Sequence, residues 1–218
     1  MNATSRIAES HSKTMDRMYR LQRHFYDVSR RYYLLGRDRM LDELQATPGQ
    51  NILEVGCGTG RNLASAARRY PLCALFGFDI SSEMLRSAKA SLQGSNVVLA
   101  QADATHFDGQ SLFGHPQFDR IYFSYTLSMV PQWEAAIGQA LRHLAPLGQL
   151  HIVDFGQSEK WPRIFKAMLF KWLYLFQVTP RADLYQVIKK LVQPHNLTIK
   201  TTEQFGGYVL HAVIHRND

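Results

Sequence analysis

The sequence predicts an α/β fold, a doubly wound and mostly parallel sheet of seven strands in one domain that spans residues 1–218. Three observations support this prediction. Strand-like apolar segments alternate with amphipathic helical segments along most of the chain. A glycine-rich loop follows the first strand and opens a helix. Two consecutive strands close the chain, and the length of 218 residues suits a single full core.

The strands are recognised as short apolar segments bounded by glycine, proline or polar residues. They are expected at 51–55, 75–80, 96–101, 118–124, 149–154, 197–201 and 208–214. Helices are expected between them at 61–69, 82–92, 134–144, 160–178 and 184–192. The last two strands should form a hairpin around Gly206 and Gly207, because consecutive glycines favour a tight turn.

The segment before the first strand is expected to be helical. Met18, Leu21, Phe25 and Val28 recur at three- and four-residue spacing within 12–44, which predicts one or two helices there. We expect residues 1–46 to form a helical lid. A second departure from the simple alternation is a basic, aromatic helical insert, expected at 160–192.

Composition narrows the class of protein. Hydrophobic residues make up 45% and charged residues 20%, which is typical of a soluble globular chain. No segment has the roughly 18 uninterrupted apolar residues of a spanning helix, and the start of the chain lacks the apolar stretch of a secretory signal. We therefore expect a cytoplasmic location. The two cysteines, Cys57 and Cys73, have no metal-type spacing, so no metal is expected.

The net charge of +7 is distributed unevenly. Residues 1–40 carry nine basic and four acidic side chains, and residues 160–200 carry eight basic and one acidic. The stretch between them, 41–159, has a net charge of −4. Either both basic segments are simply solvated helix faces, or they form a positive surface for an anionic partner.

The motif with the clearest chemistry is Glu54-Val55-Gly56-Cys57-Gly58-Thr59-Gly60, at the end of the first strand. Glycines here let the chain turn sharply and let backbone approach a ligand. A dinucleotide fingerprint has its third glycine one position later. S-adenosylmethionine has no phosphate and offers a carboxylate, an amino group, a sulfonium, a ribose and an adenine. The spacing therefore favours this cofactor over a dinucleotide.

Acidic residues at the ends of the first three strands match the groups of that cofactor. Asp79 is placed to accept both ribose hydroxyls, and Asp103 to accept from the adenine amino group. Glu54 is placed to bind the methionine amino group indirectly. Ile80 and Met84 are expected on the adenine faces. The full predicted cofactor set is Glu54, Gly56, Gly58, Gly60, Asp79, Ile80, Asp103, Ala104 and Ser124. The alternative is another nucleotide-binding fold in which the two aspartates only cap helices.

This ordered set resembles the class I S-adenosylmethionine-dependent methyltransferases over roughly residues 48–215, a family with a Rossmann-like sheet whose last strand is antiparallel. Two further segments, Tyr19–Arg39 and Phe118–Pro131, resemble the bacterial betaine-lipid N-methyltransferases. That resemblance implies N-methylation of diacylglyceryl-homoserine to its trimethylated form. The N-terminal segment also resembles phosphatidylethanolamine N-methyltransferases and quinone C-methyltransferases, so these acceptors stay open.

Three side chains are the candidate catalytic residues. Tyr26 would reach the site from the N-terminal lid, Tyr125 follows the fourth strand, and Asp154 ends the fifth. Aromatic faces hold a quaternary ammonium well, and an acid can hold or deprotonate an amine. The structural alternative is that the tyrosines pack in the core or lid, and that Asp154 caps a helix or lies on the surface.

The predicted partner besides the lipid headgroup is an anionic membrane surface. Tryptophan, phenylalanine and leucine recur at helical spacing within 160–178, with lysine and arginine between them. A basic helix of this composition suits peripheral binding to the inner membrane. The alternative is a helix that covers the sheet or forms a dimer contact.

The sequence also bears on three other functions. A nucleic-acid enzyme is disfavoured because Ser124-Tyr125-Thr126-Leu127 replaces the Asn/Asp-Pro-Pro-Tyr/Phe of base-amino methyltransferases. A quinone or small-molecule methyltransferase would share the cofactor motif and the membrane face. A non-catalytic binding protein would not need the complete set of cofactor residues.

Overall fold

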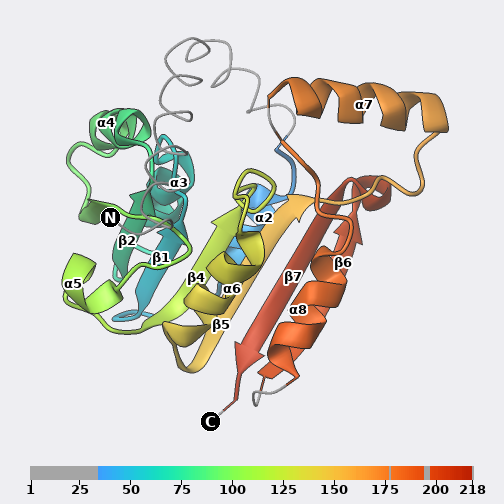
Figure 1. The fold of residues 1–218 in the computed structure, drawn as a ribbon. Helices are drawn as coiled ribbons and strands as arrows, with labels where there is room; N and C mark the ends of the chain where they lie inside the picture. Colours follow the sequence, from blue (N-terminus) through green and yellow to red (C-terminus); the bar gives the residue numbers. More distant parts are fainter. Residues whose placement is uncertain (1–33, 177, 194–196, 218) are drawn as a thin grey trace, which may run out of the picture.

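The computed structural model describes residues 34–176, 178–193 and 197–217. They form a seven-stranded sheet of order β3-β2-β1-β4-β5-β7-β6 (Figure 1). All neighbouring strands pair in parallel except those next to β7, which is antiparallel to both β5 and β6. The predicted fold class is confirmed, and so is the antiparallel final strand.

The strands are β1 (Asn51–Val55), β2 (Ala74–Asp79), β3 (Val97–Gln101), β4 (Phe118–Ser124), β5 (Leu144–Phe155), β6 (Leu197–Gln204) and β7 (Val209–Arg216). The helices are α2 (Arg37–Glu43), α3 (Arg61–Arg69), α4 (Ser82–Ser91), α5 (Gly109–Phe113), α6 (Trp133–Arg142), α7 (Arg163–Leu175) and α8 (Leu184–Val192). A single 3₁₀ turn, Phe205–Gly207, joins β6 to β7 at the predicted hairpin.

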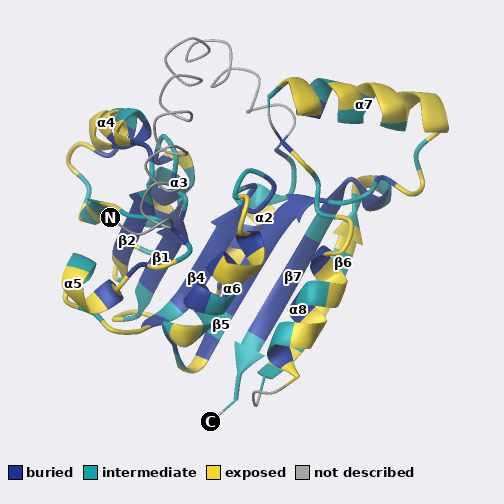
Figure 2. Ribbon diagram, in the orientation of Figure 1, coloured by how far each residue is buried: buried dark blue, intermediate teal, exposed yellow. Residues whose placement is uncertain are grey.

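The sheet is buried on both faces, as Figure 2 shows for its central strands. Successive side chains alternate between two apolar clusters because a strand points them to opposite faces. On β4, Ile121 and Phe123 belong to the cluster beneath α6 and α8, whereas Tyr122 belongs to the cluster beneath α2. The strands therefore contain nearly continuous apolar runs, which is typical of a parallel sheet.

The boundary between α6 and β5 differs most from the prediction. The helix expected to reach residue 144 ends at Arg142, and β5 begins at Leu144, five residues before the expected start. The pairing with β4 jumps from Leu144 to Gln149, so the residues between them bulge out of the ladder. The short helix α5 was not predicted, because five residues are too few to show a helical period. Its N-cap is Asp108, whose carboxylate accepts the backbone N–H groups of Gln110 and Ser111.

The N-terminal helical prediction is tested only at its end. The chain makes a turn at 34–36, and Gly36 adopts a left-handed conformation (φ 78°) before α2 begins. A continuous helix through residue 44 is therefore excluded at Gly36. The rest of the predicted lid lies outside the described residues and stays a prediction.

Helix α7 projects beyond the edge of the sheet above β6 and β7 (Figure 1). It begins after Pro162, three residues later than predicted, because proline fits the start of a helix but not its interior. Within the described residues, none of the helices combines the length and the apolar character needed to cross a bilayer.

Candidate active site

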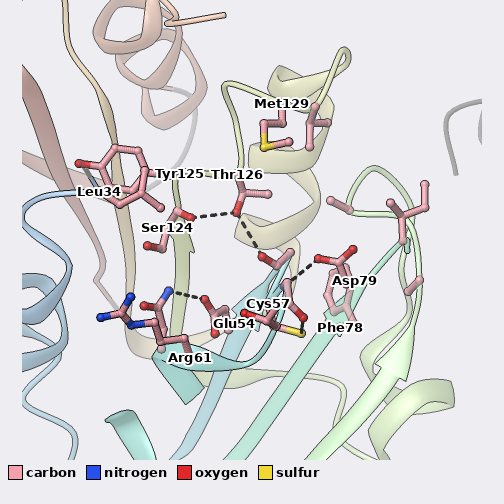
Figure 3. A pocket seen from close by; sticks show the side chains of 18 of the residues that line it. Leu34, Glu54, Cys57, Arg61, Phe78, Asp79, Ser124, Tyr125, Thr126 and Met129 are labelled. Carbon is pink, nitrogen blue, oxygen red and sulfur yellow. Dashed lines mark hydrogen bonds between the residues drawn. The ribbon is translucent and has the colours of Figure 1, made fainter. Parts of the chain in front are cut away.

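A pocket opens at the carboxyl ends of β1, β2 and β4, where parallel α/β sheets bind ligands (Figure 3). Its volume, counting the open mouth, is about 970 Å³, at the upper end for small-molecule sites. The lining residues are Leu34, Arg37, Glu54, Gly56, Cys57, Gly58, Thr59, Arg61, Asn62, Phe78, Asp79, Ile80, Ala102, Asp103, Ala104, Ser124, Tyr125, Thr126, Met129 and Val130. Eight of the nine predicted cofactor residues are among them; Gly60 is not.

The glycine loop forms the floor of this pocket. A Cβ atom at Gly56 would lie 2.4 Å from Cγ2 of Thr126, so only glycine lets the loop approach the segment after β4. Gly60 (φ 75°) is instead the N-cap of α3, and it faces Ala88 in α4 and Leu92, the C-cap of α4. Its contribution is therefore to the packing of α3 against α4, which explains its absence from the pocket wall.

Asp79 organises the loop from the end of β2. Its Oδ2 accepts the backbone N–H of Gly58 (2.8 Å) and its Oδ1 accepts that of Ser81 (2.9 Å). An ionised carboxylate has about four acceptor positions, so one side chain can both hold a loop and accept from ribose hydroxyls. The residue thus holds the loop and presents acceptor oxygens at the pocket.

The adenine end of the pocket is apolar with one acid. Ile80, Phe78 and Ala104 line it together with Asp103. Asp103 is held in place by Thr105, whose backbone N–H and hydroxyl both donate to Oδ1 (2.8 and 2.7 Å). Met84, which was expected to pack on the adenine, is buried in α4 and is not part of the wall.

Glu54 lies at the opposite end and is 1% exposed. It accepts hydrogen bonds from Nδ2 of Asn62 (2.8 Å) and from the hydroxyl of Tyr122 (3.1 Å). Burial raises the pKa of Glu54 to about 8, and the two hydrogen bonds and the nearby charge of Arg37 only partly offset this effect. A bound ammonium would favour the ionised form.

Sequence reasoning missed three residues at this end: Asn62, Tyr122 and Arg37. Tyr122 faces Glu54 directly across the β1–β4 ladder, a register that the sequence does not reveal. Asn62 lies in the first turn of α3, and its spacing from the glycine loop is the one available signal. Arg37 reaches the pocket from α2, a placement that depends on the whole sheet.

Ser124 ends β4 with its side chain in the pocket wall. Its hydroxyl is buried and has no hydrogen-bond partner among the described residues. A buried polar group of this kind is costly unless a ligand or water satisfies it. This orphaned hydroxyl is an independent sign that the pocket is built for a polar ligand.

Tyr125 was predicted to be catalytic, and the structure gives its hydroxyl a definite partner. The hydroxyl donates to the backbone carbonyl of Leu35 (2.6 Å), while the ring packs edge-on against Phe155. Burial raises the pKa of Tyr125 well above its usual value, so the phenol stays protonated. A phenolate base at this position is therefore not supported.

Asp154 was also predicted to be catalytic, but it does not line the pocket. Its carboxylate is 1% exposed and accepts the backbone N–H groups of Ser128 (3.1 Å) and Phe155 (2.8 Å). It thereby fixes the loop after β4 from outside the pocket. Burial raises its pKa to about 6. The third predicted catalytic residue, Tyr26, lies outside the described residues.

Comparison with known proteins agrees with this geometry. Residues 52–148 match the family described as methyltransferase domain. The chain contains a class I S-adenosylmethionine-dependent methyltransferase domain. It is 30% identical over 105 residues to trans-aconitate 2-methyltransferase of Deinococcus radiodurans, covering 48% of this chain and 38% of that protein. It is also 30% identical over 169 residues to demethylmenaquinone methyltransferase of Beutenbergia cavernae, covering 72% and 66%.

Solved methyltransferase structures share the whole fold. The plantazolicin methyltransferase BpumL, solved with S-adenosylhomocysteine (SAH), superposes with a TM-score of 0.70 at 15% identity and covers 98% of this chain and 99% of that one. The chain spans only about a third to a half of the length of the first curated relatives. Their acceptors therefore do not transfer to this domain.

S-adenosylmethionine is the cofactor of this domain, and the residues present fit it. When bound, it supplies an electrophilic methyl group on a sulfonium. Glu54 would hold the amino group, Asp79 the ribose hydroxyls and Asp103 the adenine amino group. Among the residues that the structure describes, no cluster of histidine, cysteine or acidic side chains is placed to hold a metal ion.

Proposed function

We propose that this methyltransferase domain acts on the amine of a membrane-lipid headgroup, with diacylglyceryl-homoserine as the favoured acceptor and the trimethylated betaine lipid as product. The observation that carries the proposal is the exposed face of α7. Five of the ten large apolar side chains that are exposed in the described part of the chain belong to this one helix. They are Ile164, Phe165, Met168, Tyr174 and Leu175.

The same helix is basic. Arg163, Lys166 and Lys171 lie within it, and it contains no acidic residue. Apolar side chains interleaved with cations match the boundary between acyl chains and anionic headgroups. We therefore propose a peripheral position on the cytoplasmic face of the inner membrane, with α7 in contact with the lipids.

Helix α7 is joined on its C-terminal side to the wall where an acceptor would enter. The backbone N–H of Thr179 donates to the carbonyl of Ser128 (2.9 Å), and the Arg181 guanidinium donates to the carbonyls of Leu127 and Val130. Leu173 belongs to the same apolar cluster as Leu34 and Tyr125, two residues of the pocket wall. A lipid held at α7 would thus have its headgroup near the pocket.

The lining of this entrance favours an amine acceptor. Leu34, Tyr125, Met129 and Val130 contribute no side chain that takes a proton near neutral pH. The headgroup ammonium first loses a proton to water. The neutral amine then carries the lone pair that attacks the methyl carbon, as the bond from that carbon to sulfur breaks. The first two transfers each release a proton to water, and the third leaves a quaternary ammonium, which has no proton to lose.

A second candidate is a quinone precursor, favoured by the similarity to demethylmenaquinone methyltransferase. Such an acceptor also resides in the membrane. Methylation of its ring carbon, however, requires removal of a phenolic proton, and the entrance offers no base among the described residues. Phosphatidylethanolamine is a third acceptor, with the same amine chemistry.

The test is methyl transfer by the purified full chain from labelled S-adenosylmethionine to mixed micelles, read by lipid mass spectrometry. Diacylglyceryl-homoserine, phosphatidylethanolamine and a demethylated quinone are offered in parallel. We expect mass gains in steps of one methyl on the homoserine lipid, and no gain with Asp79→Ala. Label on the quinone alone, or on none of the lipids, would contradict the proposal.

A further inference from the structure

The turn at Leu34–Arg37 connects the pocket to the segment after β4. Leu34 and Arg37 both line the pocket, and Gly36 between them adopts a left-handed conformation (φ 78°). A Cβ at Gly36 would lie 3.1 Å from Cγ1 of Val209, so the turn is seated closely on the sheet. The shape of this turn decides where the Arg37 side chain points.

Two side-chain hydrogen bonds fix the turn. Nε of Arg37 donates to the carbonyl of Leu34 (2.8 Å), and the hydroxyl of Tyr125 donates to the carbonyl of Leu35 (2.6 Å). The second bond joins residues 90 positions apart in the chain. Tyr125 itself is rigidly held, because it is 1% exposed and its ring packs on Phe155.

The backbone of Tyr125 is also unusual. Its φ of 57° lies in the left-handed region, which is uncommon for a bulky non-glycine residue and unfavourable without compensation. Its backbone N–H donates to Val153, and its hydroxyl reaches Leu35. The fold thus maintains a strained conformation that aims this hydroxyl at the turn.

Arg37 lies at the methionine end of the site. It lines the pocket, and its positive charge lowers the pKa of both Glu54 and Tyr125, so the guanidinium lies near both side chains. The methionine moiety of the cofactor has one ammonium and one carboxylate. Glu54 matches the first and Arg37 the second, since a guanidinium binds a carboxylate strongly.

We propose that Tyr125 is a positioning residue that acts through Arg37: its hydroxyl fixes the Leu34–Arg37 turn, and the turn presents the Arg37 guanidinium to the methionine carboxylate. This inference rests on the cofactor and not on the proposed lipid acceptor. Its test measures cofactor binding alone. The inference can therefore fail while the proposed acceptor is correct, and the proposed acceptor can be wrong while the inference holds.

The test compares two ligands by isothermal titration calorimetry of the full chain: S-adenosylmethionine and its decarboxylated form, which lacks only the carboxylate. We expect Arg37→Gln to weaken binding of S-adenosylmethionine about 10- to 100-fold, and Tyr125→Phe about three- to tenfold. Binding of the decarboxylated ligand should change less than about twofold in both variants. In the double variant, loss of the tyrosine hydroxyl should add little to the loss from Arg37→Gln.

Tyr70 provides a matched control. Its hydroxyl also donates to a backbone carbonyl of the same N-terminal segment, that of Leu41 (2.5 Å), but it does not line the pocket. Tyr70→Phe should lower the melting temperature as Tyr125→Phe does and leave both affinities unchanged. The proposal is overturned if Tyr125→Phe weakens both ligands equally, if it weakens neither, or if Tyr70→Phe has the same effect. Should Tyr125→Phe not fold, equal weakening of both ligands by Arg37→Gln would overturn it.

Discussion

Glu54 is fully buried at the end of β1, and its only hydrogen-bond donors in the described structure are Asn62 and Tyr122. Neither donor carries a charge, so burial dominates and raises the pKa to about 8. In the cofactor-free protein this side chain is therefore largely protonated at neutral pH. An ammonium bound beside it would shift it toward the carboxylate.

The raised pKa predicts how stability depends on pH. The protonated form stabilises the fold, so its contribution is complete below the unfolded pKa of about 4.5 and is lost as pH rises through about 8. Glu54→Gln, which mimics the protonated acid, should unfold at nearly the same denaturant concentration as wild type at pH 4. At pH 8.5 the variant should be the more stable by about 1–3 kcal/mol.

Urea unfolding of the cofactor-free protein at the two pH values measures this difference. The pKa of Asp154 is also raised, to about 6, so this residue too makes the unfolding free energy fall as pH rises. It does so equally in wild type and in Glu54→Gln, and its effect cancels when the two proteins are compared. Equal stabilities of wild type and Glu54→Gln at pH 8.5 would show that Glu54 ionises without cost.

Residue roles could be predicted from the sequence only where a strand end determines them. Glu54 and Asp79 lie at the ends of β1 and β2, and Asp103 follows β3; the structure brings all three to one pocket. The contacts of Tyr125 with the Leu35 carbonyl and of Asp154 with the Ser128 N–H could not be predicted, because these backbone groups belong to segments far away in the sequence. A strand pattern shows to which face of the sheet a side chain points, but not which atom that side chain contacts.

At the scale of elements, all seven strands were predicted, because each combines β-branched or aromatic residues with a flanking turn. The predicted boundaries were wrong where the local sequence pattern was ambiguous. A helix was expected to continue to residue 144, whereas β5 already begins there, and Pro146 and Gly148 lie in its bulge. Helix α5 depends on a single capping aspartate, Asp108, which has no periodic pattern to support it.

Helix α7 should bind anionic membranes through its basic side chains. Lys166→Glu with Lys171→Glu should reduce sedimentation with anionic liposomes by at least about tenfold, because each basic side chain near the surface contributes about 1 kcal/mol. Lys189→Glu with Lys190→Glu is the matched control. It makes the same charge change in the last turn of α8, on a helix that runs along the sheet away from α7 (Figure 1).

We expect the control variant to sediment like wild type and both variants to keep their affinity for S-adenosylmethionine. Raising the salt concentration should weaken wild-type binding, because screening acts on exposed charges. If wild type does not sediment with anionic liposomes, or if both variants lose binding equally, α7 is not the membrane contact.

For the whole molecule, the sheet order explains why the site lies where it does. The chain runs outward from β1 through β2 to β3 at one edge, and then returns to β4 and continues toward the other edge, so the order reverses between β1 and β4. Loops diverge at such a point and leave a crevice at the carboxyl ends of the strands. Alternation of strands and helices predicts this crevice. It does not predict the acceptor, which depends on the loop after β4 and on the segments at either end of the chain.

We expect this crevice to bind S-adenosylmethionine through the acids at the strand ends. Calorimetric titration of the purified full chain, wild type and Asp79→Ala, tests it most directly, with a thermal melt of each protein as the control for folding. We predict one site per chain in wild type, and at least a tenfold weaker site in Asp79→Ala, which loses the ribose acceptor and the bond to the Gly58 N–H. No binding by wild type, or equal affinity in a folded Asp79→Ala protein, would contradict the account.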